Sequence, residues 1–225
     1  MGIIFSKMEI DVAQISEMKD ACQLCVSNGM PGIVVHPSLS SNAITERGLI
    51  GGMFGIASPI DAPLGHLEGV AKFRHLTTET LEADGFEIYV NMAGKKSIQL
   101  IRYFTGLHDF VRNRISQVAE IRYALVDLNS ENIKEFITAL ANSPTPKCIR
   151  NDAPAKTQVK NANIDSHRTY IKMIREHTNI PIKVSGNISY QTGLAILNEP
   201  NTKIAVNLSQ AQSIVKEFHG HNQSH

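Results

Sequence analysis

The feature that most constrains the fold is an alternation of short apolar runs with longer amphipathic stretches along the chain. The runs are strand-length and rich in β-branched residues, whereas the stretches between them space apolar residues as in a helix. Strands are therefore predicted at Gly32–His36, Met53–Ala57, Phe86–Asn91, Ile121–Val126, Lys147–Arg150, Pro181–Val184 and Lys203–Val206. An eighth strand is assigned either to Ile3–Phe5 or to Met8–Val12.

Helical periodicity fills the gaps between these strands. Helices are predicted at Ile15–Val26, Leu39–Leu49, Leu67–Ala83, Ser97–Val118, Glu131–Ala141, Asp165–His177, Tyr190–Leu197 and Ser209–Phe218. Apolar strands separated by helices form a parallel sheet with both faces covered. The pattern predicts a single-domain (β/α)8 TIM barrel of the α/β class over residues 1–218, with residues 219–225 as a flexible, histidine-containing tail. A doubly wound open sheet competes, but the chain has no G-x-G-x-x-G fingerprint.

Composition narrows the function classes. A formal charge of +1 gives no electrostatic reason to expect nucleic acid or an anionic membrane as partner. The apolar runs are too short to span a bilayer, and no signal-peptide pattern opens the chain. Cys22 and Cys25 form a C-x-x-C inside a predicted helix without a second ligand pair, which favours packing over redox or metal chemistry. We therefore expect a reduced, cytoplasmic protein with no cofactor and no metal site.

The most informative segment for function is Ile180–Ile188, Ile-Pro-Ile-Lys-Val-Ser-Gly-Asn-Ile. Lys183 lies within a strand pattern that predicts burial, and an unpaired buried ammonium is costly. The Ser185-Gly186-Asn187 turn precedes a helix, where free backbone N–H groups can hold a phosphate. A strand lysine beside an anion site suits a sugar-phosphate enzyme that works through a Schiff base. The alternative is a lysine that is simply paired with a carboxylate.

Two loop-like segments follow predicted strands at their carboxyl ends. Ser58–Gly65 holds two prolines and a glycine, and Asn151–Asn163 is polar with Pro154. The carboxyl ends of the strands form the barrel face on which active sites are built.

The succession of motifs over Gly32–Met92 resembles the deoxyribose-phosphate aldolase family. It runs through Ile-Val-Val-His-Pro, a helix ending Leu-Ile-Gly-Gly, a third strand, Pro-Leu-Gly, a helical Lys72 and Gly-Phe-Glu-Ile-Tyr-Val-Asn. The segment Ile182–Ile188 resembles the seventh strand of that family, where a lysine precedes a phosphate-binding glycine turn. The resemblance covers about Ile15–Phe218 and implies a class I aldolase on a (β/α)8 barrel. It also implies a homodimer.

The chain departs from this family at the expected catalytic positions. The family forms its imine with a lysine at the end of strand six, where this chain has Arg150. A guanidinium stays protonated and cannot supply the neutral amine. Lys147 lies three residues earlier, which places it about 10 Å toward the other end of the barrel with reversed side-chain parity. The family's acid/base aspartate on strand four corresponds here to Tyr89, a different kind of proton donor.

The resemblance also implies a phosphate site shared by the turns after strands seven and eight. In this chain those turns supply Ser185, Gly186 and Asn187 on one side and Asn207 and Ser209 on the other. The second turn lacks the family's glycine-serine run.

Three functions remain open on the sequence. In the first, the chain is a lyase acting on a small sugar phosphate or aldehyde, with Lys183 as the nucleophile, its pKa lowered by Arg150, and Tyr89 with Glu87 moving protons. In the second, aldol chemistry has lapsed, and Arg150, Lys183 and the Ser185-Gly186-Asn187 turn bind a sugar phosphate or another small anion. In the third, the barrel carries a different Schiff-base or lyase reaction. The salt-bridge alternative for Arg150 names Asp152 or Asp127 as its partner.

Overall fold

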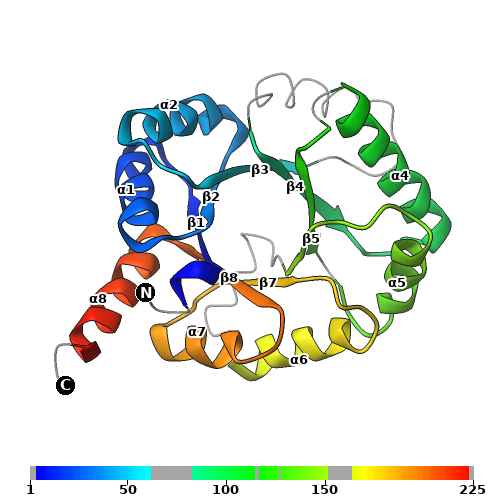
Figure 1. Cartoon of the computed structure of the whole chain (residues 1–225). Coiled ribbons are helices and arrows are strands. Elements are labelled where there is room, and N and C mark those ends of the chain that lie inside the picture. Colours follow the sequence, from blue (N-terminus) through cyan, green and yellow to red (C-terminus); the bar gives the residue numbers. More distant parts are fainter. Residues whose placement is uncertain (1–3, 62–82, 115–116, 127, 152–163, 223–225) are drawn as a thin grey trace.

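The chain folds into a closed barrel of eight parallel strands with helices around the outside (Figure 1). The computed structural model describes residues 4–61, 83–114, 117–126, 128–151 and 164–222. Each strand pairs with the next one along the chain, and β1 pairs with β8 to close the barrel. The strands are β1 (Met8–Val12), β2 (Gly32–Val35), β3 (Gly55–Asp61), β4 (Gly85–Asn91), β5 (Glu120–Val126), β6 (Ile149–Asn151), β7 (Ile182–Ser185) and β8 (Thr202–Asn207). The predicted (β/α)8 barrel is confirmed.

The helices form the outer layer. They are α1 (Met18–Asn28), α2 (Ser40–Ile50), α4 (Ser97–Arg114), α5 (Ile133–Ala141), α6 (Ile164–Arg175), α7 (Tyr190–Leu197) and α8 (Leu208–Asn222), with short 3₁₀ turns at Phe5–Lys7, Ile15–Glu17 and Pro37–Leu39. None of the helices in these described ranges combines the length and apolarity that a membrane crossing requires.

The hydrophobic core lies between the strands and the helices. Alternate residues of each strand face outward, so that β1 contributes Met8, Ile10 and Val12 to this layer, each at most 3% exposed. The intervening residues of β1, Glu9 and Asp11, face the barrel interior. A parallel sheet with such alternation separates an apolar outer layer from an interior that holds charged side chains.

The glycine of β2 permits a close approach of two strands. A β-carbon on Gly32 would lie 2.4 Å from the carbonyl oxygen of Gly55 on β3, so a side chain would force the backbones apart. Beside it, the thiol of Cys25 donates to the carbonyl of Gly32 at 3.7 Å. Cys22 and Cys25 are both buried, and burial raises the pKa of Cys22 to about 11. These cysteines pack the core, as their place in a helix predicts.

Several boundaries differ from the sequence-based prediction. The eighth strand is Met8–Val12, because Phe5–Lys7 forms a 3₁₀ turn. The third strand continues to Asp61, so the prediction of a loop from Ser58 is wrong for its first four residues; the extended φ of proline is compatible with a strand.

At the C-terminus, α8 runs to Asn222 and takes in residues 219–222 of the predicted tail. The ring of His221 stacks on Tyr190 at 5.7 Å between centroids, which anchors this extension. The predicted helix Leu67–Ala83, except for its last residue, and the predicted loop beyond Asn151 lie outside the described residues.

Candidate functional site

Oppositely charged side chains alternate through the barrel interior. From the carboxyl ends of the strands toward their amino ends they are linked in the order Asp11, Arg150, Glu87, Lys183, Glu9, Arg122, Glu120 and Lys147. Each contact in this series joins a cation to a carboxylate. We call these eight residues the interior ion chain.

Lys183 lies at the centre of the interior ion chain and is 0% exposed. Its Nζ is 2.7 Å from Oε2 of Glu9 and also forms a short ion pair with Oε2 of Glu87. Burial alone would lower the pKa of Lys183, but the carboxylates of Glu87 and Glu9 outweigh it and raise the pKa above its ordinary value. The ammonium form of Lys183 is therefore the stable form.

Arg150 connects this centre to the carboxyl-end mouth of the barrel. Its guanidinium binds both carboxylate oxygens of Asp11, at 2.6 and 3.0 Å, and Oε1 of Glu87 at 2.6 Å. The side chain of Arg150 is only 6% exposed, whereas that of Asp11 is 32% exposed. Asp11 is thus the member of this group that a ligand at the mouth can reach.

The other end of the interior ion chain reaches the amino ends of the strands. Arg122 on β5 bonds Glu9 at 2.8 Å and Glu120 at 2.8 Å, and Lys147 lies 3.5 Å from Glu120. Burial would raise the pKa of Glu9, but Lys183 and Arg122 overcome this effect and lower it to about 2. Lys147 is exposed at this end, away from the mouth, as its position before strand six predicts.

The burial that the strand pattern predicts for Lys183 is confirmed, but the predicted lowering of its pKa is wrong. Lys183 points into the barrel and is paired in register with Arg150 on β6. Glu87 forms ion pairs with both cations, so carboxylate attraction exceeds the repulsion between them and the pKa of Lys183 rises instead of falling. Arg150 is salt-bridged, but to Asp11 and Glu87; Asp152 and Asp127 lie outside the described residues.

Tyr89 lies on β4 two residues beyond Glu87, on the same strand face. It is half-buried and pairs in register with Ala124 of β5. Its hydroxyl is therefore closer to the carboxyl-end mouth than the carboxylate of Glu87 is.

The turn after β7 carries the first predicted anion-binding residues. The backbone N–H of Ser185 donates to Oδ1 of Asn151 at 2.8 Å, and the Ser185 hydroxyl donates to the carbonyl of Asn151 at 2.7 Å. Gly186 has a φ of +131°, which favours glycine. In the described part of the chain, the backbone N–H groups of Gly186 and Asn187 make no hydrogen bond. These two donors, rather than Ser185, remain available to a ligand.

The turn after β8 lies beside the first turn and is linked to it through Gln210. The amide of Gln210 donates to Oδ1 of Asn187 at 2.9 Å, and its backbone N–H donates to Oδ1 of Asn207 at 2.9 Å. The Ser209 hydroxyl donates to the same Asn207 oxygen. The structure thus brings the predicted residues of both turns together. Gln210 was missed because no local pattern distinguishes it from other polar residues in the first turn of a helix.

His167 is a second residue that the sequence analysis missed. It lies in α6, is 2% exposed, and its Nε2 is buried without a hydrogen-bond partner among the described residues. Its Cε1 is 3.7 Å from the position that a β-carbon on Gly186 would occupy. Burial lowers the pKa of His167, so the ring is neutral at pH 7. Only the packing of α6 against the glycine turn reveals this position.

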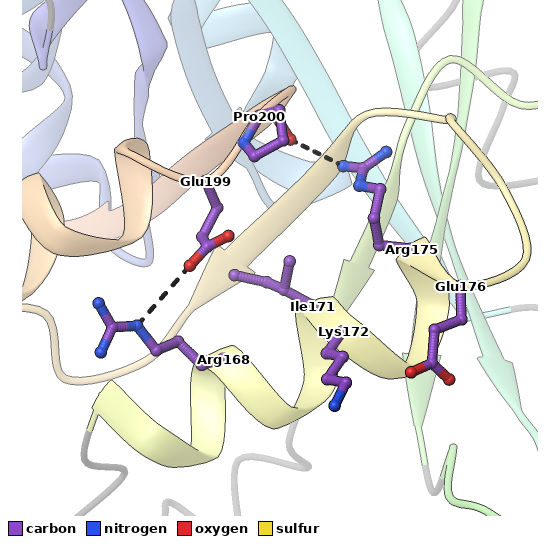
Figure 2. Close-up of a pocket in the computed structure, with 7 residues that line it drawn as sticks. All are labelled: Arg168, Ile171, Lys172, Arg175, Glu176, Glu199 and Pro200. Atoms are coloured by element: carbon purple, nitrogen blue, oxygen red, sulfur yellow. Dashed lines mark hydrogen bonds and ion pairs between the residues drawn. The ribbon is translucent and has the colours of Figure 1, made fainter.

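A surface cavity of about 380 Å³ lies away from these residues, on the outside of the barrel along α6 (Figure 2). Arg175 donates to the carbonyl of Pro200 at 3.1 Å, and Nε of Arg168 is 3.7 Å from the Glu199 carboxylate. None of the predicted site residues lines this cavity. In the described ranges, no group of three His, Cys, Asp or Glu side chains is placed to hold a metal ion.

Comparison with solved structures identifies the same barrel in known enzymes. A tetrameric deoxyribose-phosphate aldolase from Aeropyrum pernix superposes with a TM-score of 0.73 at 11% identity, over 96% of this chain and 91% of that one. A putative deoxyribose-phosphate aldolase from Coccidioides immitis gives 0.70 at 14% identity, over 96% and 85%. An N-acetylmannosamine-6-phosphate 2-epimerase from Clostridium perfringens gives 0.55 at 13% identity, over 97% and 94%.

No protein-family model and no curated protein sequence matches the chain. At such low identities the structural likeness establishes the fold alone. The resemblance to deoxyribose-phosphate aldolases that the sequence motifs indicated is confirmed at this level.

Proposed function

We propose that this protein binds a small phosphorylated sugar at the carboxyl-end mouth of the barrel, and that Lys183 is a structural cation and not an imine-forming nucleophile. The observation that carries the proposal is the environment of the Lys183 ammonium, which is fully buried between two carboxylates. This is a form of the second function left open by the sequence, in which Lys183 supports the site and does not contact the ligand.

The chemistry of imine formation supports this choice. A lysine attacks a carbonyl only as the neutral amine, so enzymes that use it lower its pKa by burial or by a neighbouring cation. Here Glu87 and Glu9 raise the pKa of Lys183, and the side chain has no solvent-exposed surface for a carbonyl to approach. An imine at Lys183 would also leave two buried carboxylates without their shared partner.

The mouth offers groups that suit a phosphorylated polyol. The free N–H groups of Gly186 and Asn187 precede α7 and can hold a phosphate, assisted by the dipoles of α7 and α8. Asp11 and Tyr89 lie at the interior side of the mouth and can accept hydrogen bonds from sugar hydroxyls. Sugar-phosphate enzymes among the structural neighbours are consistent with such a ligand.

A Schiff-base lyase is the second candidate, favoured by the likeness to two aldolase structures. In that function Lys183 is the nucleophile, Arg150 favours its neutral form, and Tyr89 transfers protons. It requires Glu9 and Glu87 to release Lys183 when a substrate binds.

Reductive trapping separates the two candidates. The protein is incubated with a short aldehyde and borohydride, and the modified lysines are identified by peptide mass spectrometry. We expect adducts at exposed lysines such as Lys134 and Lys216, which serve as internal controls, and none at Lys183. Rapid, selective modification of Lys183 would contradict the proposal and establish the Schiff base.

Binding is tested by calorimetry with a pentose 5-phosphate. Gly186→Ala should weaken binding about tenfold or more, because its φ of +131° strains any side chain and displaces the turn. Gly48→Ala is the matched control, since a β-carbon there meets nothing within 4 Å. Equal affinity in both variants, or no saturable binding in the parent protein, would contradict the proposed site.

A further inference from the structure

The buried histidine beside the glycine turn has no role in the function proposed above. His167 lies in the first turn of α6, and the Cε1 edge of its ring faces Gly186. A buried polar atom without a hydrogen-bond partner is costly, so few such atoms persist in folded proteins without a use. The ring carbon bonded to the unpaired Nε2 lies against a turn whose N–H groups at Gly186 and Asn187 are also unpaired among the described residues.

We propose that His167 supports the anion site at Gly186 and Asn187 from the buried side of the turn, and that the site holds a dianion more tightly when the imidazole carries a proton. This inference rests on the proposed phosphate site and adds to it a pH-dependent positioning residue, which acts on the anion through the turn. The ligand chemistry is a tetrahedral dianion, either the phosphate group of a sugar phosphate or a free inorganic anion.

The electrostatic surroundings of His167 explain why protonation and anion binding are coupled. On α6 the ionisable residues within one turn of His167 are Asp165, Arg168 and Tyr170. On β7 there is Lys183, whose ammonium is bound inside the barrel, and α7 carries only Tyr190. Burial is the cause of the lowered pKa of His167, with no contribution from a charged group. Among the residues that the structure describes, no carboxylate contributes to the pKa of His167, so a bound anion would be the counter-charge of an imidazolium at this position.

Reciprocity then fixes what binding must do to the histidine. If a proton on His167 strengthens anion binding by some factor, a bound anion must strengthen proton binding by the same factor. A tenfold effect on affinity corresponds to an increase of about one pH unit in the pKa of His167.

The test uses sulfate as the probe, because sulfate remains a dianion across this pH range whereas a phosphate monoester changes charge near pH 6. Affinity for sulfate is measured by calorimetry between pH 5 and 8 on the whole chain. We expect binding to tighten about tenfold toward pH 5 in the parent protein, and this gain to disappear in His167→Gln. His177→Gln, at an exposed histidine just beyond α6, is the matched control and should keep the gain.

Nuclear magnetic resonance titration of the His167 ring protons gives an independent readout. Sulfate at saturation should raise the pKa of His167. If His167→Gln fails to fold, His167→Phe is used as the test variant instead, because it keeps a ring in the same space. Equal pH dependence with and without the imidazole, or an unchanged His167 titration, would overturn the inference while leaving the anion site intact. Failure of sulfate and pentose phosphate to bind at any pH would overturn the site itself.

Discussion

Replacement of Lys183 by methionine tests the proposal that this residue is structural. Methionine has a similar unbranched stem but no charge, so the substitution leaves Glu9 and Glu87 without their shared cation. Removing one partner of a buried ion pair costs about 3–5 kcal/mol. Glu9 keeps Arg122 at 2.8 Å and Glu87 keeps Arg150 at 2.6 Å, so we expect a loss of about 3 kcal/mol.

This loss is measured by urea unfolding at pH 7, followed by circular dichroism. For a chain of this length it corresponds to a fall in melting temperature of about 6–12 °C. Lys134→Met, on the exposed face of α5, is the control and should change stability by less than about 0.5 kcal/mol. A Lys183→Met protein that is as stable as the control variant would refute the structural role.

Three further predictions concern stability. The Glu9 carboxylate has a pKa of about 2 in the folded protein against 4.5 in the unfolded chain, so its ionisation contributes about 3 kcal/mol of stability. This contribution is complete above pH 4.5 and is lost as the pH falls toward 2. The urea midpoint measured as a function of pH should show the loss, and Glu9→Gln should flatten that dependence in the same window. Gly32→Ala should destabilise the barrel by about 1–3 kcal/mol in the same urea assay, because its β-carbon would lie 2.4 Å from the Gly55 oxygen, whereas Gly48→Ala should not. Arg175→Met should lower the melting temperature by about 4–8 °C, since its guanidinium donates to backbone carbonyls of both loops beside α6; an unchanged melting temperature would contradict this role.

The fold was predictable from the sequence because strand and helix periodicities are local properties. Alternation along the chain predicted the eight strands, and the apolar run around Lys183 predicted that this lysine is buried. The position of Lys147 at the opposite end followed from its distance along the strand. The continuation of β3 past Ala57 was missed because proline usually ends a strand.

The charge partners could not be predicted in the same way. Lys183 and Glu9 are 174 positions apart, and only barrel closure brings β1 within reach of β7. A lysine in a strand therefore indicates either an ion-pair partner or a role in chemistry, but the sequence does not say which of the two applies or which residue is the partner. The same limit applies to His167, because its proximity to Gly186 depends on how α6 packs and not on any spacing.

The distribution of the interior ion chain has a consequence for how the protein folds. Its most deeply buried carboxylates, Glu9 and Glu87, come from the first four strands, whereas the cations that neutralise them, Arg122, Arg150 and Lys183, come from the last four. A half-barrel would hold like charges with no counter-charge, which disfavours a dry, compact state. During synthesis from the N-terminus, we therefore expect Glu9 of β1 and Glu87 of β4 to become buried only after β5, β6 and β7 have been made. We expect separate fragments of the two halves to associate, because each carries the counter-charges of the other.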